Sequence, residues 1–146
     1  MYKKYDELIG RFAIDEFPID YWSDVAIVEA SDMLDDFSED DWSILLSSVR
    51  DKSECWVLRM CESMGDVAEE RALYVLLEVM SRESEEVTCA ALDAIRSMVS
   101  LGLDVSKYSV PINVAIESAK MTKSNVGLLS VLDLEKMLLK RWFFGW

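Results

Sequence analysis

With 146 residues, 51% of them hydrophobic and 29% charged, the chain is long enough to bury one hydrophobic core and too apolar to be intrinsically disordered. Its formal net charge is -13 and it has no histidine, which argues against nucleic acid as a partner, because phosphate binding depends on lysine and arginine. Only two prolines and five glycines interrupt the sequence, and no strand-like alternation is present, so we expect an all-α protein.

The first third of the chain predicts three helices. Residues 2–13 and 23–36 have helical patterns, and Phe17-Pro18-Ile19 breaks the chain between them, since proline disfavours helix at the residue before it. Ser38-Glu39-Asp40-Asp41 resembles a capping sequence that starts a helix to about Lys52. Four apolar residues follow at helical spacing and predict its buried stripe: Trp42, Leu45, Leu46 and Val49.

Five more helices are expected after residue 52. Ser53 caps the first, which ends at Gly65 in a left-handed conformation, and Asp66 starts the second, which carries leucines to Met80. The remaining three are expected to start at Ser84 and stop at Gly102, to start at Ser109 with Pro111 in the first turn, and to start at the cap Asn125. The apolar stripe of the last helix is expected at Leu128, Leu129, Leu132, Leu138 and Leu139.

Short connections between these helices predict antiparallel hairpins stacked side by side in a single domain over residues 1–146. We divide it into N-terminal helices at 1–37, hairpin repeats at 38–142 and an aromatic tail at 143–146. A weak repeat supports the stack, because Leu58, Ser63, Met64 and Val67 match Leu92, Ser97, Met98 and Leu101 at an offset of 34. A degenerate HEAT-like α-solenoid is the preferred architecture, and an irregular helical bundle is the alternative.

Cysteines and tryptophans add expectations about the core. Cys55, Cys61 and Cys89 match no zinc or redox spacing, so we expect reduced, buried thiols. Trp42 and Trp56 are expected in the core, whereas the tail from Trp142 to Trp146 either folds back on the last hairpin or anchors a partner. Acidic residues occupy the place of a signal-peptide core and no apolar run is long enough to span a membrane, so we expect a cytoplasmic protein without a membrane partner.

Negative charge is concentrated in the front part of the chain. Residues 1–93 contain 24 acidic and 8 basic side chains, and residues 94–146 contain 4 and 7. Because crowded carboxylates are relieved by a cationic partner, we predict a partner-binding surface there; its residues are Asp32, Asp35, Asp36, Glu39, Asp40, Asp41, Glu69 and Glu70. A solvated helix junction is the simpler alternative, and the spacing does not match a calcium loop.

The sequence contains little that would support catalysis. Without histidine, the commonest general acid and base is missing, and no phosphate-binding glycine loop or nucleophile elbow is present. We therefore expect no enzyme, no catalytic residue, no bound metal and no cofactor.

Three segments resemble a known class of protein: Ser53-Glu54-Cys55-Trp56-Val57-Leu58-Arg59, Ser63-Met64-Gly65-Asp66 and Ala91-Leu92-Asp93-Ala94-Ile95-Arg96-Ser97-Met98. Over about residues 38–142 the chain resembles HEAT-like helical immunity proteins of bacterial polymorphic toxin systems, including contact-dependent growth inhibition. The resemblance implies a cytosolic protein that binds a cognate basic toxin, commonly a nuclease with an RNase favoured, and blocks its active site. The alternatives are a HEAT-like scaffold or adaptor in a larger assembly, anchored by the aromatic tail, and a carboxylate hydrolase that needs a divalent metal.

Overall fold

Helices make up all the regular secondary structure in residues 1–13, 21–82, 84–121 and 125–144, which the computed structural model describes. A π-helical turn, η1 (Trp22–Ala26), precedes the third helix, and two 3-10 turns, η2 (Val49–Asp51) and η3 (Ser106–Tyr108), lie in connections. The expected all-α class is confirmed. The α-helices of these residues are α1 (Tyr2–Phe12), α3 (Ile27–Asp35), α4 (Glu39–Ser48), α5 (Glu54–Ser63), α6 (Glu70–Val79), α7 (Glu85–Ser100), α8 (Ser109–Lys120) and α9 (Asn125–Phe144).

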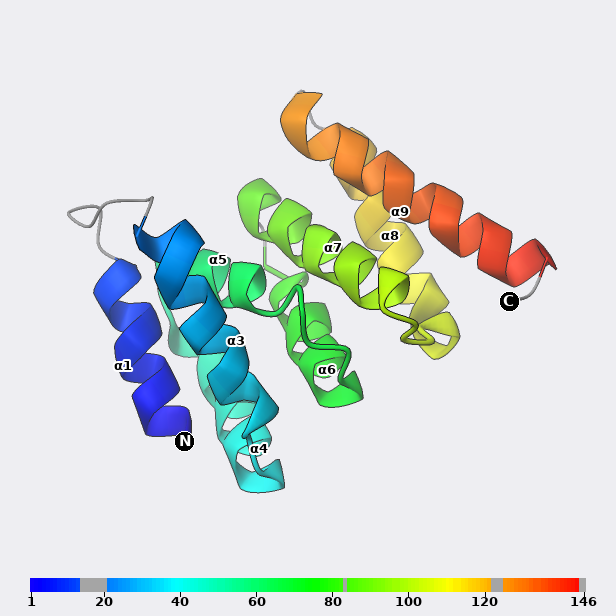
Figure 1. The fold of residues 1–146 in the computed structure, drawn as a ribbon. Helices are drawn as coiled ribbons and strands as arrows, with labels where there is room; N and C mark the ends of the chain where they lie inside the picture. Colours follow the sequence, from blue (N-terminus) through cyan, green and yellow to red (C-terminus); the bar gives the residue numbers. More distant parts are fainter. Residues whose placement is uncertain (14–20, 83, 122–124, 145–146) are drawn as a thin grey trace.

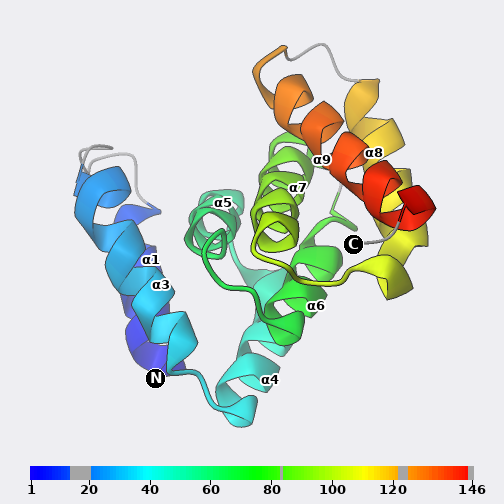
Figure 2. The same cartoon turned by 45° about the vertical axis from the view of Figure 1, so that its right-hand side comes forward.

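Alternate helices lie next to one another in space. One row runs α3, α5, α7 and α9, each in contact with the next (Figure 1). Behind it, α1 contacts α4 and α4 contacts α6, while α8 packs on α7 and α9 (Figure 2). Stacked helical hairpins would give such an arrangement; the HEAT-like repeat itself remains a prediction.

Three serines start helices as the sequence predicts. The Oγ atoms of Ser38, Ser53 and Ser84 accept hydrogen bonds from the backbone N–H three residues later, at N···O distances of 3.1, 3.2 and 3.3 Å. Each bond satisfies one of the N–H groups that the first helical turn leaves without a partner. These caps fix where α4, α5 and α7 begin, and therefore where the connections before them lie.

Two predicted helix boundaries are wrong. Asp66 does not start a helix: Val67 is buried and its N–H bonds to the Met64 carbonyl, so the chain turns until Glu69 caps α6. Gly65 does not take a left-handed conformation, and the only residue with positive φ in the described ranges is Gly102, at 103°. Here the burial of Val67 outweighs the capping preference of Asp66.

The start of α8 also differs in detail from the prediction. Ser109 is its first residue, and the cap position falls on Tyr108, which makes no side-chain capping bond. Pro111 lies in the first turn, as predicted. The break at Phe17-Pro18-Ile19 and the end of the aromatic tail, Gly145 and Trp146, lie outside the described residues.

The buried face of α9 is not the predicted one. Because α9 packs on both α7 and α8, Val131, Leu134 and Leu138 point into the core at spacings of three and four. Of the five leucines predicted to face inward, only Leu138 is fully buried. Leu129, Leu132 and Leu139 are exposed and Leu128 is half-buried.

The predicted core residues are mostly confirmed. Trp42 and Trp56 are buried, whereas Leu46 faces solvent on α4. Trp142 is partly buried and packs against the core. Together with residues from each described helix up to α9, these side chains form one continuous cluster.

One of the thiols contradicts its prediction. Cys61 is buried and Cys89 half-buried, but Cys55 is exposed, because α5 turns Trp56, Val57 and Cys61 inward and leaves the preceding residue on its outer side. All three cysteines are free. Burial raises the pKa of the Cys61 thiol to about 12.

A buried serine connects the first hairpin to the rest of the array. The Ser63 Oγ donates to the Met60 carbonyl at 2.7 Å and lies 2.7 Å from the Tyr5 hydroxyl on α1. The Ser63 carbonyl accepts a hydrogen bond from Ser31 Oγ on α3 at 2.6 Å. The end of α5 therefore bonds to both α1 and α3 through one residue.

Candidate acidic binding surface

The connection between α3 and α4 places a group of carboxylates in solvent. Phe37 is buried there and contacts the rings of Tyr5 and Trp42, at centroid distances of 5.4 and 5.0 Å. With Phe37 held inside, the flanking polar residues are directed outward. The exposed acidic residues are Asp32, Asp35, Asp36, Glu39 and Asp40.

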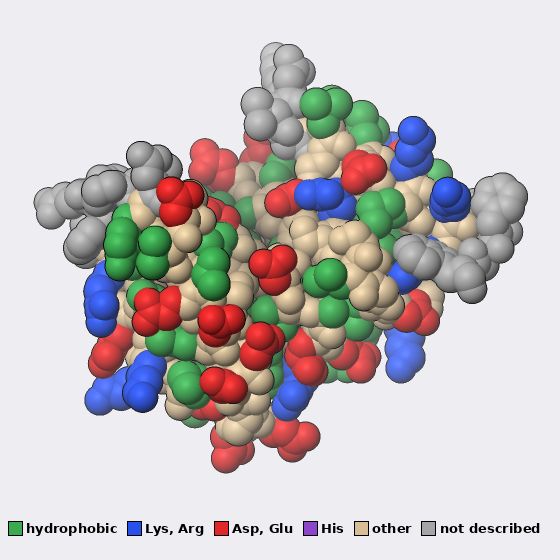
Figure 3. Space-filling view, viewed as in Figure 1, with side chains coloured by type: hydrophobic (Ala, Val, Ile, Leu, Met, Phe, Trp, Pro, Cys, Tyr) green, Lys and Arg blue, Asp and Glu red, His purple; other side chains and the backbone are tan. Residues whose placement is uncertain are grey.

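Four of these residues form what we call the aspartate group: Asp32, Asp35, Asp36 and Asp40. None of the four carboxylates has a hydrogen bond or ion pair with any residue that the structure describes. In the space-filling view, acidic side chains gather over α3 and the neighbouring ends of α4 and α6 (Figure 3). Carboxylates gathered in one region without compensating charges repel one another. A positively charged group placed among them would therefore be stabilised.

Asp41 has a structural role instead. Its carboxylate accepts hydrogen bonds from the backbone N–H of Ser38 at 2.9 Å and of Tyr2 at 3.1 Å, and lies 3.6 Å from the N-terminal amine. The bond from the Ser38 N–H, followed by the one from Tyr2, holds the pKa of Asp41 below its usual value. Asp41 therefore joins the start of α4 to α1, and it is less accessible to a partner than its neighbours.

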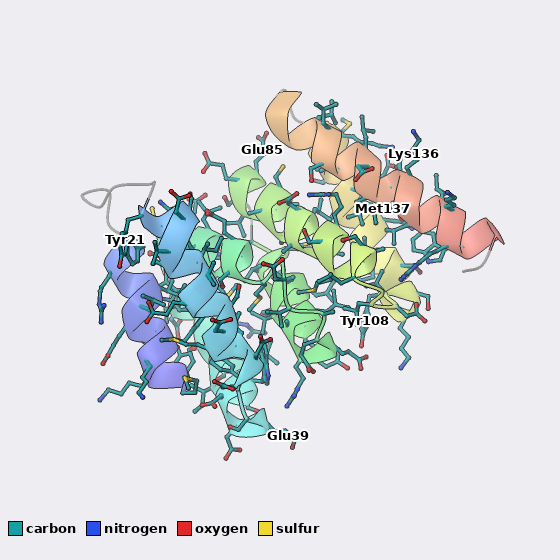
Figure 4. All side chains as sticks on the ribbon, viewed as in Figure 1. Tyr21, Glu39, Glu85, Tyr108, Lys136 and Met137 are labelled. Carbon is teal, nitrogen blue, oxygen red and sulfur yellow. The ribbon has the colours of Figure 1, made fainter. Side chains whose placement is uncertain are left out.

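The fold brings a basic residue to the predicted acidic surface from α6. Arg71 Nε donates to Glu69 Oε1 at 2.9 Å, and its guanidinium lies 5.9 Å from the Trp42 ring centroid. The hydrogen bond to Glu69 raises the pKa of Arg71, and the charge of Glu39 on α4 adds to the rise. Arg71 is therefore bonded to Glu69, while Glu39, at the first turn of α4 (Figure 4), acts on it only through its charge.

Glu70 lies next to Glu69 in sequence but faces another neighbour. Its Oε1 accepts a hydrogen bond from the Tyr108 hydroxyl of η3 at 3.1 Å. The predicted surface thus divides into the unpaired aspartate group and a second group, Glu69 and Glu70, whose carboxylates accept hydrogen bonds from α6 and η3. Glu39 lies between the two groups, because its carboxylate has no hydrogen bond or ion pair with a described residue but is near enough to Arg71 to affect the pKa of that residue. The first group is the better candidate for binding.

The sequence prediction missed residues on η1 and α3, and Tyr21 just before them, that extend this surface. Glu29 is exposed three residues before Asp32, a spacing that puts both on one side of the helix. Tyr21, Val25 and Val28 are also exposed, with 47 to 56% of each side chain accessible. The same three-and-four spacing could have indicated them, although periodicity does not reveal which face of an amphipathic helix is covered. Apolar side chains therefore adjoin the aspartate group.

Neither a metal site nor a membrane-spanning helix is found in the described part of the chain. No three cysteine or acidic side chains there are arranged to hold a metal ion. None of the helices combines the length and the apolar composition needed to cross a bilayer.

Comparison of the chain with protein-family models, with curated proteins and with solved structures finds no match.

Proposed function

We propose that this chain is a cytoplasmic immunity-type inhibitor that binds a basic toxin domain, most suitably a nuclease and in particular an RNase, and covers its active site. The aspartate group carries the proposal, because four exposed carboxylates without a described partner adjoin one helix connection. The resemblance of the sequence to HEAT-like immunity proteins supports the same class. All four carboxylates come from residues 32–41, a short segment that the buried side chains of Leu34 and Phe37 hold against the core.

The charge fits a nuclease for a physical reason. A nuclease cleft carries positive potential to hold the phosphates of its substrate, so an anionic surface can occupy the same field. Long-range attraction mainly raises the association rate, while apolar anchors that become buried slow dissociation. Val25 of η1 and Val28 of α3 lie close in sequence to the acids and supply such anchors.

The test uses charge reversal in the full chain. Asp36→Lys combined with Asp40→Lys should slow association with the toxin encoded next to this chain by roughly tenfold or more at low ionic strength. Added salt should reduce the difference, since screening weakens steering. Asp51→Lys is the matched control, because Asp51 is exposed in η2 at the other end of α4.

Stopped-flow association and protection of cells that express the toxin are the two measurements. Equal association rates for the double variant and the Asp51→Lys control, at every salt concentration, would contradict the role of the aspartate group. Failure of the unmodified chain to protect cells or to bind the toxin would contradict the proposed function itself.

A scaffold or adaptor is the second candidate, and one groove favours it. A cavity of about 560 Å³ lies between the end of α6, the start of α7 and α8, with apolar walls that include Leu77, Met80 and Val114. Grooves of this kind accept side chains of other proteins. If Val114→Lys abolishes binding of a partner and the aspartate variants do not, the scaffold function is the correct one.

A further inference from the structure

The outward face of α9 is apolar although no described helix covers it. Leu129, Leu132 and Leu139 are 73, 41 and 45% exposed, and Lys136 between them points away from α7 (Figure 4). The contacts of α9 with α7 and α8 use the opposite face, through Val131, Leu134 and Leu138. The last helix of the array thus has two apolar faces, of which only one is packed.

The spacing on the outward face is that of a helix-pairing seam. Positions 129, 132, 136 and 139 are separated by three, four and three residues, the pattern of a and d positions in a two-stranded coiled coil. Leucines occupy three of the four positions and a lysine one. A single polar residue in such a seam selects the register and the orientation of the pair. An exposed apolar stripe with this spacing is suited to another helix.

We propose that a second copy of this chain docks here, with its α9 antiparallel to the first around a two-fold axis between residues 134 and 135. In that register each Lys136 lies opposite Asp133 of the second copy, and Asp133 is exposed on α9. Leu132 then lies level with Met137 of the second copy and within one helical turn of its Leu139, twice by symmetry. A parallel pair would instead place the two Lys136 ammonium groups together.

Charge identifies a second copy as the occupant of this face. Two chains with a net charge of -13 repel each other over most of their surfaces. Residues 94–146, which include α9, are the part with more basic than acidic side chains, 7 against 4. Contact through α9 therefore joins the copies where their repulsion is weakest. A basic partner of the kind expected at the aspartate group is not attracted to this face, so the proposal is independent of the toxin-binding function.

Sedimentation velocity of the full chain over a range of concentrations tests the proposal. The expected result is a monomer–dimer equilibrium whose dimer fraction rises with concentration. Leu132→Lys should weaken dimerisation by about tenfold or more, because two buried leucine contacts are lost per dimer. Leu101→Lys is the matched control: Leu101 is 55% exposed and lies beyond the end of α7, so this variant should dimerise like the unmodified chain.

Charge exchange tests the antiparallel register. Lys136→Asp puts two carboxylates opposite each other in each half of the dimer and should weaken it, whereas Lys136→Asp combined with Asp133→Lys should restore it. Circular dichroism checks that the double variant folds, because Asp133 also lies 3.6 Å from Arg96 of its own chain.

Three results would overturn the proposal. One is an unmodified chain that stays monomeric at all accessible concentrations. Another is an equal loss of dimer in Leu132→Lys and Leu101→Lys. The third is growth of oligomers beyond the dimer that Val28→Lys on α3 prevents, which would indicate head-to-tail association in place of a two-fold pair.

Discussion

Replacement of Asp41 by alanine tests how the acidic connection is held to the rest of the molecule. The substitution removes the acceptor for the Ser38 and Tyr2 backbone N–H groups and the ion pair with the N-terminal amine. A capping bond contributes about 1 kcal/mol and a second hydrogen bond to a charged group a similar amount, while the exposed ion pair adds less. We expect the free energy of unfolding to fall by about 2 kcal/mol, and the melting temperature by roughly 4–8 °C.

Urea denaturation at neutral pH measures the loss of unfolding free energy in Asp41→Ala. The same measurement repeated at lower pH tests whether the ionised Asp41 carboxylate is its cause. Because the pKa of folded Asp41 is lowered from 3.8, its stabilisation is complete above that value and disappears as the pH falls through the folded pKa. The difference between Asp41→Ala and the unmodified chain should therefore persist down to pH 3.8 and shrink only as the pH falls further, through the lowered pKa of the folded protein.

Asp40→Ala is the control, because Asp40 is exposed one residue earlier and has no bonded partner in the described ranges. It should change the stability by less than about 0.5 kcal/mol. Equal losses for the two variants, or a loss for Asp41→Ala that does not depend on pH, would refute the reasoning.

The cysteines and glycines give two further predictions. A thiol reagent should label exposed Cys55 rapidly in the folded protein, whereas buried Cys61, with its raised pKa, should react only as the chain unfolds. Cys55→Ser should remove the fast phase of labelling. A fast phase that persists in this variant would contradict the assigned exposures. Gly102→Ala should destabilise the fold by about 1 kcal/mol because the φ angle of Gly102 is 103°. Gly10→Ala in α1, where an added Cβ has open space, should stabilise the fold by about 0.5–1 kcal/mol. Thermal unfolding measures both changes, and shifts of the same sign would contradict the conformational argument.

Local signals in the sequence were sufficient for the helix class and for several helix starts. Ser38, Ser53 and Ser84 act as caps through atoms within three residues of themselves, so their role does not depend on the rest of the fold. The same holds for Gly102, whose lack of a side chain permits the turn after α7. Asp66 failed as a predicted start because the burial of Val67, a tertiary effect, keeps the chain in a turn.

The faces of the helices depended on tertiary packing and were harder to predict. Leucines occur on both sides of α9, so periodicity could not decide that Leu134 faces the core and Leu132 does not. The acidic surface was predicted only from the number of acidic residues in each part of the sequence. It could not show that Arg71 reaches Glu69 and Glu39 from α6, nor that Asp41 bonds to the backbone of α1.

The hydrogen bonds around Ser63 determine how the first hairpin responds to binding. Because one residue at the end of α5 is bonded to both Tyr5 and Ser31, α1 and α3 cannot rotate as a unit without breaking one buried and one partly buried hydrogen bond. The backbone of α3 is thus held in place before any partner arrives, and little backbone conformational entropy is left to lose in a complex. Binding of a partner at α3 should accordingly show a single kinetic phase, and its observed rate should rise in proportion to the partner concentration.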